Sequence, residues 1–268
     1  MTGLGSVPAD IRAKISRRLD SVEVREGVRI LLAVESGSRA WGFPSPDSDY
    51  DVRFIYVRPA AWYVSVEPGR DVIEEEVGEV DVNGWDLRKA LGLMLKGNAV
   101  LVEWLMSPIV YREDARFRAE FTDLLQASAK PAPLLHHYLS LGRSMRRNDA
   151  FKGVSFPIKK YFYTLRPAVA LRWLRVHNYA ALPPMNLREL AADSSLPPSV
   201  ASLLIELIEA KSRTRELGTT EPVALLEDFI DREFAIAEEN AAGLTNIARP
   251  VQCEADELLR RRAFALMG

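Results

Sequence analysis

Apolar residues in the first third of the chain come in short runs typical of strands, with polar residues at the turns between them. Four runs are strand candidates: residues 28–34, 50–57, 71–77 and 79–82. Gly78 separates the last two, so the pattern predicts a hairpin there. A helix is expected over residues 8–20, because Pro8 suits a first helical turn, and one helical turn is expected over residues 39–43. This part of the chain therefore mixes strands and helices.

From residue 86 onward the spacing of apolar positions becomes helical. The side chains of Asp86 and Asn98 can accept hydrogen bonds from the first backbone N–H groups of a helix, so they predict helices that end near Lys96 and Met106. Seven more helices are expected: residues 115–127, 134–147, 156–176, 187–192, 198–217, 222–240 and 254–266. The second half of the chain is therefore expected to be mostly helical.

The best candidate linker is the proline-rich segment Lys130–Pro133. The predicted fold class is α/β (α+β), with a mixed sheet and helices packed on it. The sheet is expected in a first domain over residues 1–110. A mostly helical C-terminal domain is expected over residues 111–268.

The composition is that of a soluble globular protein, since 48% of the 268 residues are hydrophobic and 27% are charged. No apolar run approaches the roughly 20 residues that a membrane-spanning helix needs, so no membrane association is expected. The N-terminal residues lack the apolar core of a signal peptide. Cys253 is the only cysteine, which excludes an intramolecular disulfide and any site built from several cysteines. Together these features favour a reducing, cytoplasmic setting.

The net charge of −2 conceals two segments of opposite charge. Residues 67–86 contain eight acidic residues and one basic residue, whereas residues 140–178 contain nine Lys or Arg and one Asp. The basic segment also contains Tyr, Phe and Trp, and this combination suits a surface that binds phosphates and stacks on nucleobases. The same aromatic residues could fill a core, and the same charges could coat a solvated helix face. The sequence leaves both interpretations open.

The clearest chemical signal lies between the first two strand candidates. Gly37 and Ser38 follow the first apolar run, and eleven residues after Ser38 comes Asp49, with Asp51 two positions further. Alternate residues of a strand point to one face, so Asp49 and Asp51 are expected on the same face. Two neighbouring carboxylates repel unless a cation lies between them, and Mg²⁺ or Mn²⁺ suits such hard oxygen ligands together with substrate phosphates. Glycine lets the backbone approach a ligand closely, and Ser38 adds a hydroxyl for the terminal phosphates.

A third carboxylate would complete a site for two metal ions, which can stabilise the attacking and the leaving oxygen of an in-line displacement. Asp81, flanked by Val80 and Val82 on a neighbouring strand candidate, is the preferred residue. It could bind the catalytic metal and help to deprotonate an attacking hydroxyl. Asp86 is the rival, although capping of the next helix already explains it.

Two other motifs are excluded. Residues 47–51 resemble the start of an EF-hand loop, but that loop needs Gly at its sixth position and Glu at its twelfth. This chain has Val52 and Arg58 there. A P-loop needs a Lys after the glycine turn, and none follows Gly37. The remaining acidic residue of the stretch, Asp47, is interpreted as a turn residue.

These residues resemble the DNA polymerase β-like nucleotidyltransferase superfamily. Its pattern is a strand ending in Gly-Ser, a helix, a strand with Asp-x-Asp, and a third acidic residue on a later strand. Gly37, Ser38, Asp49, Asp51 and Asp81 match that pattern. Longer blocks are similar to the predicted nucleotidyltransferases called RNA-ligase-associated or YcgL-like (RlaP): GSRAWGFPSPDSDYDVRFIYV, DVNGWDLRKAL, NAVLVEWLMSPIVY and KKYFYTLRPAVALRWL.

The resemblance covers most of the chain and implies a polymerase β-like catalytic domain with a helical domain that covers the substrate or nucleotide. It implies Mg²⁺ or Mn²⁺ bound by Asp49, Asp51 and Asp81, and transfer of a nucleoside monophosphate from a nucleoside triphosphate to a hydroxyl with release of pyrophosphate. In related two-domain enzymes the helical domain supplies basic and aromatic side chains. The expected nucleotide-binding residues are Gly37, Ser38, Arg39, Lys152, Lys159, Lys160 and Tyr163.

The acceptor remains open at this point. The basic segment favours an RNA 3′ end, as in tRNA or RNA repair. One alternative is an adenylyltransferase that acts on a protein or a small molecule, as in toxin–antitoxin systems or antibiotic modification. Another is an inactive module that binds a nucleotide or RNA, against which the intact set of carboxylates argues.

Overall fold

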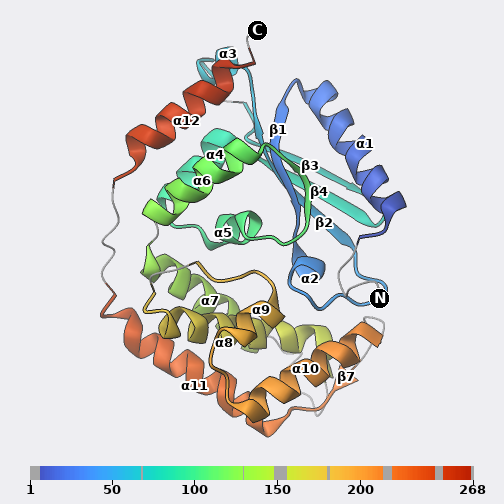
Figure 1. Ribbon diagram of the computed structural model, residues 1–268, viewed down its shortest axis with the longest axis vertical. Coiled ribbons are helices and arrows are strands. Elements are labelled where there is room, and N and C mark those ends of the chain that lie inside the picture. The colour runs from blue at the N-terminus through green and yellow to red at the C-terminus, as the bar shows by residue number, and fades with distance from the viewer. Residues whose placement is uncertain are drawn as a thin grey trace. The chain divides into compact units, whose positions relative to one another are not determined.

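The computed structural model describes residues 7–67, 69–128, 130–147, 156–179, 182–213, 219–244 and 250–266 (Figure 1). The chain divides into two compact units, each made of segments that are separate in sequence. The sheet unit comprises Ser6–Gly37, Asp49–Ala129 and Ala248–Gly268. The helical unit includes Ser38–Ser48 and Lys130–Ile247. These units are defined by packing, whereas the boundary expected at residue 110 separates functional domains. That boundary therefore stays a prediction.

The sheet unit contains a five-stranded mixed sheet with the strand order β3-β4-β2-β1-β5. Its strands are β1 (Arg29–Glu35), β2 (Tyr50–Val57), β3 (Val72–Val77), β4 (Val80–Asp86) and β5 (Val110–Glu113). β2 and β4 run parallel, whereas β1 pairs antiparallel with β2 and β5, and β3 pairs antiparallel with β4. Because the β3–β4 hairpin turns back at Gly78, β4 returns in the direction of β2 and pairs beside it.

Alternation of side chains along the strands separates the two faces of the sheet. Val52 and Phe54 of β2 are fully buried and share one apolar cluster with Leu19 of α1 (Ala9–Glu26), which covers this face (Figure 1). A Cβ at Gly84 would lie 2.2 Å from the Phe54 ring, so the glycine makes room for that ring. The neighbouring positions of β2 point to the opposite face.

Helices cover part of that opposite face (Figure 1). The remaining helices of the sheet unit are α3 (Ala60–Tyr63), α4 (Leu87–Leu95), α5 (Ala99–Leu105), α6 (Ala115–Ser128) and α12 (Gln252–Phe264). α4 and α6 contact the sheet, and α12 packs on α4. Both expected helix caps are present: Asp86 Oδ1 accepts a hydrogen bond from Arg88 N at 2.8 Å, and Asn98 Oδ1 accepts one from Leu101 N at 3.0 Å.

The helical unit is built around α8, which contacts α7, α9, α10 and α11. Its elements are α7 (Pro131–Arg146), α8 (Ile158–Val176), α9 (Leu187–Ala192), α10 (Pro198–Arg213), α11 (Ala224–Ala241) and the short strands β6 (Phe156–Pro157) and β7 (Thr219–Thr220). Tyr161, Phe162 and Leu165 are buried on α8, and Tyr138 is buried on α7. The aromatic residues of the basic segment thus form much of the core of this unit.

A short segment from the N-terminal half belongs to the helical unit. α2 (Gly37–Ala40) leads into it, and the segment Ser38–Ser48 packs among the later helices. The buried Phe43 ring stacks on Phe162, with 4.4 Å between ring centroids. Lys211 Nζ donates a hydrogen bond to Phe43 O at 2.7 Å. The stretch between the glycine turn and β2 is therefore anchored in the helical unit.

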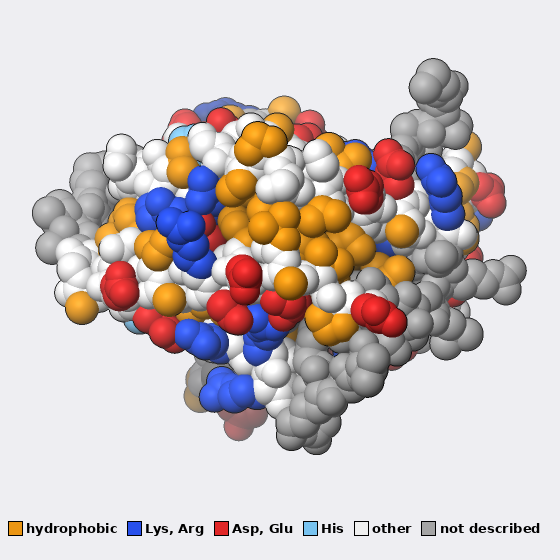
Figure 2. All heavy atoms as spheres, turned by 90° about the horizontal axis from the view of Figure 1, so that it is seen from below, with side chains coloured by type: hydrophobic (Ala, Val, Ile, Leu, Met, Phe, Trp, Pro, Cys, Tyr) orange, Lys and Arg blue, Asp and Glu red, His pale blue; other side chains and the backbone are white. Residues whose placement is uncertain are grey.

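The helical unit carries a pocket of about 150 Å³ between α8, α10 and α11. Val200, Leu225 and Phe229 contribute apolar surface to it, and Arg172 and Arg232 contribute charge. Figure 2 shows one face of the molecule on which apolar side chains form a central patch with charged side chains around it. None of the helices in the described part of the chain is both long and apolar enough to cross a bilayer.

The predicted fold class, a mixed sheet with helices followed by a helical region, is confirmed. The expected linker at Lys130–Pro133 lies where the chain passes from one unit to the other, but Pro131–Pro133 form the first turn of α7, where proline lacks only N–H groups that the helix does not use. The helix expected over residues 254–266 is present as α12, but it belongs to the sheet unit. The sequence pattern did not predict β5, which has only four residues.

Candidate active site

Asp51 and Asp81 lie across from each other on neighbouring strands, since they are register partners in the parallel pair β2–β4. Val52 and Val82 belong to the apolar cluster under α1, so alternation directs the two carboxylates to the opposite face. Both side chains are partly exposed, by 32% and 41%. The sheet thus brings together two of the three carboxylates expected from the sequence.

A guanidinium group lies between these two carboxylates. Arg53 follows Asp51 by two positions on β2 and therefore points to the same face. Its Nη2 donates hydrogen bonds to Asp51 Oδ1 at 3.0 Å and to Asp81 Oδ2 at 2.8 Å. Its Nη1 donates to the backbone oxygens of Val52 at 3.1 Å and Asp81 at 3.4 Å. One cation therefore offsets the repulsion between both carboxylates.

The chemistry of these donors fits Mg²⁺ or Mn²⁺, which prefer carboxylate oxygens. Asp51 and Asp81 already direct one oxygen each toward a single positive charge. Within the described residues, however, no group of three or more His, Cys, Asp or Glu side chains is arranged to hold a metal ion. Arg53 occupies the position between the carboxylates instead. The metal site of Asp49, Asp51 and Asp81 therefore stays a prediction.

Gly37 allows the Asp51 carboxylate to lie against the turn after β1. Its φ is +60°, a conformation that residues with a side chain rarely adopt. A Cβ at this position would lie 2.1 Å from Asp51 Oδ2. Ser36 N also donates a hydrogen bond to Asp51 O at 2.8 Å. The glycine is thus required by the carboxylate as well as by the turn, while its contact with a phosphate stays a prediction.

A buried carboxylate supports Asp51 from the neighbouring strand. Glu35 ends β1 and is fully buried. Its Oε1 accepts a hydrogen bond from Asp51 N at 3.0 Å, and its Oε2 accepts one from the hydroxyl of Tyr111 on β5. Ser107 Oγ donates to Glu35 O at 2.6 Å. Glu35 therefore links the backbone of Asp51 to Tyr111 of β5 and to Ser107, which lies between α5 and β5.

Asp49 lies one residue before β2, and its side chain is exposed. The following residue fixes the start of the strand, since Tyr50 N donates a hydrogen bond to Glu79 O at 2.9 Å. Asp49 and Asp51 thus lie on either side of Tyr50, the first residue of β2. Its expected role as a metal ligand stays a prediction.

Asp86 occupies a different place on β4. Its register partner is Tyr56, and it is fully buried. Besides capping α4, it accepts a hydrogen bond from the hydroxyl of Tyr63 at 2.9 Å. Burial raises the pKa of the Asp86 carboxyl above its usual value, and burial together with the Asp86 charge raises the pKa of Tyr63. Asp81 rather than Asp86 therefore stands opposite Asp51.

The segment Ser38–Ser48 is closed on itself within the helical unit. Ser38 Oγ donates a hydrogen bond to Ser48 Oγ at 3.1 Å, and Arg39 Nη2 donates one to Ser48 O. The buried Ser48 hydroxyl also accepts a hydrogen bond from Ser45 N at 2.9 Å. The two ends of the segment are thus held together by the residues expected to contact phosphate. Their nucleotide-binding role stays a prediction.

Tyr163 is partly buried and belongs to an aromatic cluster of the helical unit. Its ring meets the Trp41 ring edge-on, with 5.7 Å between centroids. The buried Arg166 places its guanidinium 4.8 Å from the centroid of the same Trp41 ring. Lys159 and Lys160 are half-buried in the first turn of α8. Lys152 lies outside the described residues.

The arginines of the basic segment are largely engaged with α11. Arg143 forms an ion pair with Glu238, and Arg146 forms ion pairs with Glu227 and Asp231. Arg172 and Arg175 both form ion pairs with Glu233. Glu233 is buried, and it accepts hydrogen bonds from two of these arginines. Much of the segment's charge and most of its aromatic surface therefore stabilise the helical unit. The interpretation as packing surface and internal ion pairs holds for these residues.

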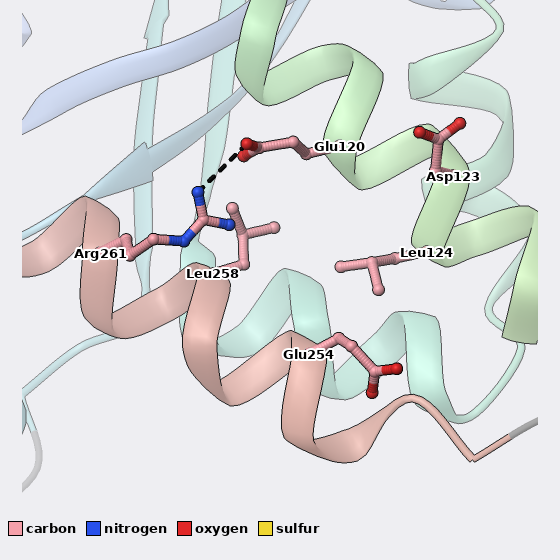
Figure 3. Close-up of a pocket in the computed structure, with 6 residues that line it drawn as sticks. All are labelled: Glu120, Asp123, Leu124, Glu254, Leu258 and Arg261. Carbon is pink, nitrogen blue, oxygen red and sulfur yellow. Dashed lines mark hydrogen bonds and ion pairs between the residues drawn. The ribbon is translucent and has the colours of Figure 1, made fainter.

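A second set of carboxylates lines a pocket of about 250 Å³ between α6 and α12 (Figure 3). Glu120 points toward Arg261, whose Nη1 lies 3.1 Å from Glu120 Oε1. Asp123 and Glu254 point in different directions (Figure 3). Burial alone would raise the pKa of Glu120, but hydrogen bonds from arginines outweigh it and lower that pKa. These carboxylates do not converge as Asp51 and Asp81 do.

Two residues beside the carboxylate pair carry no motif signal in the sequence. Arg53 could have been found from the alternation that places Asp49 and Asp51 together, since it continues the same face. Glu35 has a weaker signal, namely an acidic residue that ends an apolar run. Nothing in the sequence indicates that Tyr111 donates a hydrogen bond to it.

Comparison with known proteins shows similarity along nearly the whole chain. The model of the RNA repair pathway DNA polymerase beta family (RlaP) matches residues 11–261. The uncharacterized protein YcgL of Bacillus subtilis (strain 168) is 40% identical over 250 residues, which are 93% of this chain and 95% of that protein. Among solved structures, a nucleotidyltransferase-like protein from Exiguobacterium sibiricum 255-15 is 15% identical, with a TM-score of 0.29 over 85% of this chain and 75% of the other. The matched residues span both units.

Proposed function

Because this chain belongs to the RNA repair pathway DNA polymerase beta family and is a nucleotidyltransferase of the polymerase β type, we propose that it extends RNA. It would transfer a nucleoside monophosphate from a nucleoside triphosphate to a 3′ hydroxyl of the RNA and release pyrophosphate. The family confirms the resemblance drawn from the sequence blocks. The RNA acceptor and the metal ion are parts of the proposal.

The observation that carries the proposal is the convergence of two carboxylates on one positive charge. Asp51 Oδ1 and Asp81 Oδ2 lie 3.0 Å and 2.8 Å from a single nitrogen of Arg53. The pair lies on a sheet face opposite the apolar cluster and remains partly exposed to solvent. Such a pair is suited to hold a divalent cation against substrate phosphates.

In the proposed reaction Asp49, Asp51 and Asp81 would hold Mg²⁺ or Mn²⁺, which supplies charge stabilisation for the attacking and leaving oxygens when bound. Gly37 keeps the Asp51 carboxylate against the turn. Glu35 fixes the backbone of Asp51 through a hydrogen bond from its N–H. Asp81 would act as the general base that accepts the proton of the attacking hydroxyl.

Contacts to the triphosphate are a separate part of the proposal. Ser38, Arg39, Lys159, Lys160 and Tyr163 are the candidates within the helical unit. The half-buried position of Lys159 and Lys160 at the start of α8 suits ammonium groups that bind phosphate. Substitution of both lysines by alanine should raise the KM for the nucleotide with a smaller effect on the metal affinity of the protein.

The RNA acceptor is favoured by the family, whose model carries RNA repair in its description. An RNA with a free 3′ hydroxyl, each α-labelled nucleoside triphosphate and Mg²⁺ should give a labelled RNA one or more nucleotides longer. Asp51→Ala and Asp81→Ala should abolish the product, whereas Arg116→Gln, a change at an exposed arginine of α6, should not.

Two outcomes would contradict the proposal in different ways. Label on a protein or a small molecule, with no extension of RNA, would refute the RNA acceptor and leave the transferase activity. Extension that persists in both alanine variants would show that the reaction does not use this pair of carboxylates. RNA with a blocked 3′ end is the control for the attacking hydroxyl.

A further inference from the structure

The position of Arg53 has a consequence for how the carboxylate pair would receive a metal ion. Its Nη2 bridges Asp51 and Asp81, and its side chain is only 19% exposed. A guanidinium stays protonated at all physiological pH values, so it cannot give up its charge. One of the two negative charges of the pair is therefore already balanced by a cation of the chain itself.

We propose that Arg53 is an internal counterion that competes with the divalent cation for Asp51 and Asp81 and thereby sets the metal affinity of the site. This inference rests on the proposed function. Arg53 would leave both carboxylates when a metal ion binds. Metal binding would then have to break the ion pairs of Arg53, and the free energy of these ion pairs would weaken the observed metal binding by the same amount.

The geometry makes the two occupants mutually exclusive. Asp51 Oδ1 and Asp81 Oδ2 lie within 3.0 Å of the same Arg53 nitrogen, so a cation ligated by those two oxygens would need the same space. Two further hydrogen bonds, from Nη1 to the backbone oxygens of Val52 and Asp81, hold the guanidinium in that position. Release of Arg53 therefore breaks contacts to both strands.

The competition predicts that the protein alone binds metal weakly. A nucleoside triphosphate brings phosphate oxygens as further ligands. Its negative charge also offers the released guanidinium a new partner. Metal and nucleotide should therefore bind with positive cooperativity, and Arg53 should be the residue responsible for it.

The test measures Mn²⁺ binding without turnover. Metal-free protein is titrated with Mn²⁺ alone, and the free ion is followed by electron paramagnetic resonance. Arg53→Gln should bind Mn²⁺ about tenfold more tightly than wild type, since two partly exposed ion pairs no longer compete. Arg116→Gln, which removes an exposed arginine of the same unit, should bind as wild type does. Arg53→Lys should lie between, because a smaller group with fewer donors competes less well.

Thermal unfolding provides the second readout. Without metal, Arg53→Gln should melt at a lower temperature than wild type, because Asp51 and Asp81 then repel. Mn²⁺ should raise the melting temperature of the variant more than that of wild type. If Arg53→Gln does not fold, Arg53→Lys carries the same comparison.

The outcomes separate this inference from the proposed function. Equal or weaker Mn²⁺ binding in the folded Arg53 variants, with binding still abolished by Asp51→Asn, refutes the role of Arg53 and leaves the metal site intact. Mn²⁺ binding that Asp51→Asn and Asp81→Asn do not change refutes the metal site itself, and the role of Arg53 with it.

Discussion

Gly37 is the residue whose substitution tests the geometry at Asp51 most directly. Alanine there must adopt a φ of +60° and must place its Cβ 2.1 Å from Asp51 Oδ2. We expect Gly37→Ala to lose more than the ~1–2 kcal/mol typical of a left-handed alanine. We also expect nucleotidyl transfer to fall by about 100-fold, because a shift near 1 Å at a reacting group can have that effect. Chemical denaturation and a transfer assay measure the two losses.

Gly27 offers the matched control for that substitution. It has the same φ of +60°, but a Cβ there would meet nothing within 4 Å. Gly27→Ala should therefore show the backbone cost alone, about 1 kcal/mol, with transfer unchanged. Equal losses of transfer in both variants would contradict a specific role of Gly37 beside Asp51.

Asp86 provides a prediction about pH. Burial raises the pKa of its carboxyl in the folded protein, so the folded state binds a proton more tightly than the unfolded state. The contribution of this group to the free energy of unfolding therefore falls as the pH rises from about 4, the unfolded value, through the folded pKa. Asp86→Asn keeps an oxygen that can cap α4 and should remove this fall. The measurement is the free energy of unfolding across that pH range for wild type and Asp86→Asn. Asp123→Asn, a change at an exposed carboxylate, is the control.

At the level of the residue, the sequence predicted which side chains share a face of a strand, but not what surrounds them. Alternation along β2 and the glycine turn led to Asp51, Gly37 and Asp81 because strand geometry is periodic. The same rule could have led to Arg53. What the sequence could not provide was the register between β2 and β4, which decides that Asp81 rather than Asp86 faces Asp51. Register depends on contacts between distant strands, and one sequence does not show them.

Among the elements, α11 has the clearest energetic role. Its Glu233 has a side chain that is only 1% exposed and pairs with Arg172 and Arg175 of α8. Removal of a buried charge partner leaves the other charges uncompensated. We expect Glu233→Gln to lower the free energy of unfolding by about 3 kcal/mol, as measured by urea denaturation followed by circular dichroism.

Glu238 on the same helix is the control for Glu233. It pairs with Arg143, and both side chains are about half exposed. Exposed ion pairs of this kind contribute less than about 1 kcal/mol, so Glu238→Gln should have only a small effect. Similar losses in the two variants would argue against burial as the cause.

Local signals explain why most elements were predictable from the sequence. The caps at Asp86 and Asn98 act within three residues, and the helices that they begin are present as expected. β5 was not predictable, because three partly exposed residues followed by one exposed residue give no clear alternation. The proline-rich segment Lys130–Pro133 marks the passage between the two units, but its helical conformation was not predictable, because proline is found in the first turn of a helix as well as at a break.

At the level of the whole molecule, sequence order and compact units do not coincide. α12 follows the entire helical unit in sequence but belongs to the sheet unit. There it buries Leu258 and Ala255 and forms ion pairs from Arg262 to Asp114 and Glu120. The hydrophobic pattern of α12 predicts an amphipathic helix, but it does not show on which of the two units that helix packs.

Removal of residues 248–268 should therefore destabilise the sheet unit rather than the helical unit. The loss of several buried apolar side chains predicts a cost of at least about 3 kcal/mol. Hydrogen exchange measured by mass spectrometry should show increased exchange in α4 and α6. A truncated protein with wild-type protection in both helices would contradict the assignment of α12.

The interleaving of the two units has a consequence for synthesis of the chain. On the ribosome, residues 130–247 emerge before α12, so the helical unit can pack while the sheet still lacks its last helix. The segment Ser38–Ser48 can pack only after α8 and α10 have been translated, because Phe43 contacts Phe162 of α8 and Lys211 of α10. The packing of α4 and the ion pair between α6 and Arg262 would thus be completed last, after nearly the whole chain has been translated.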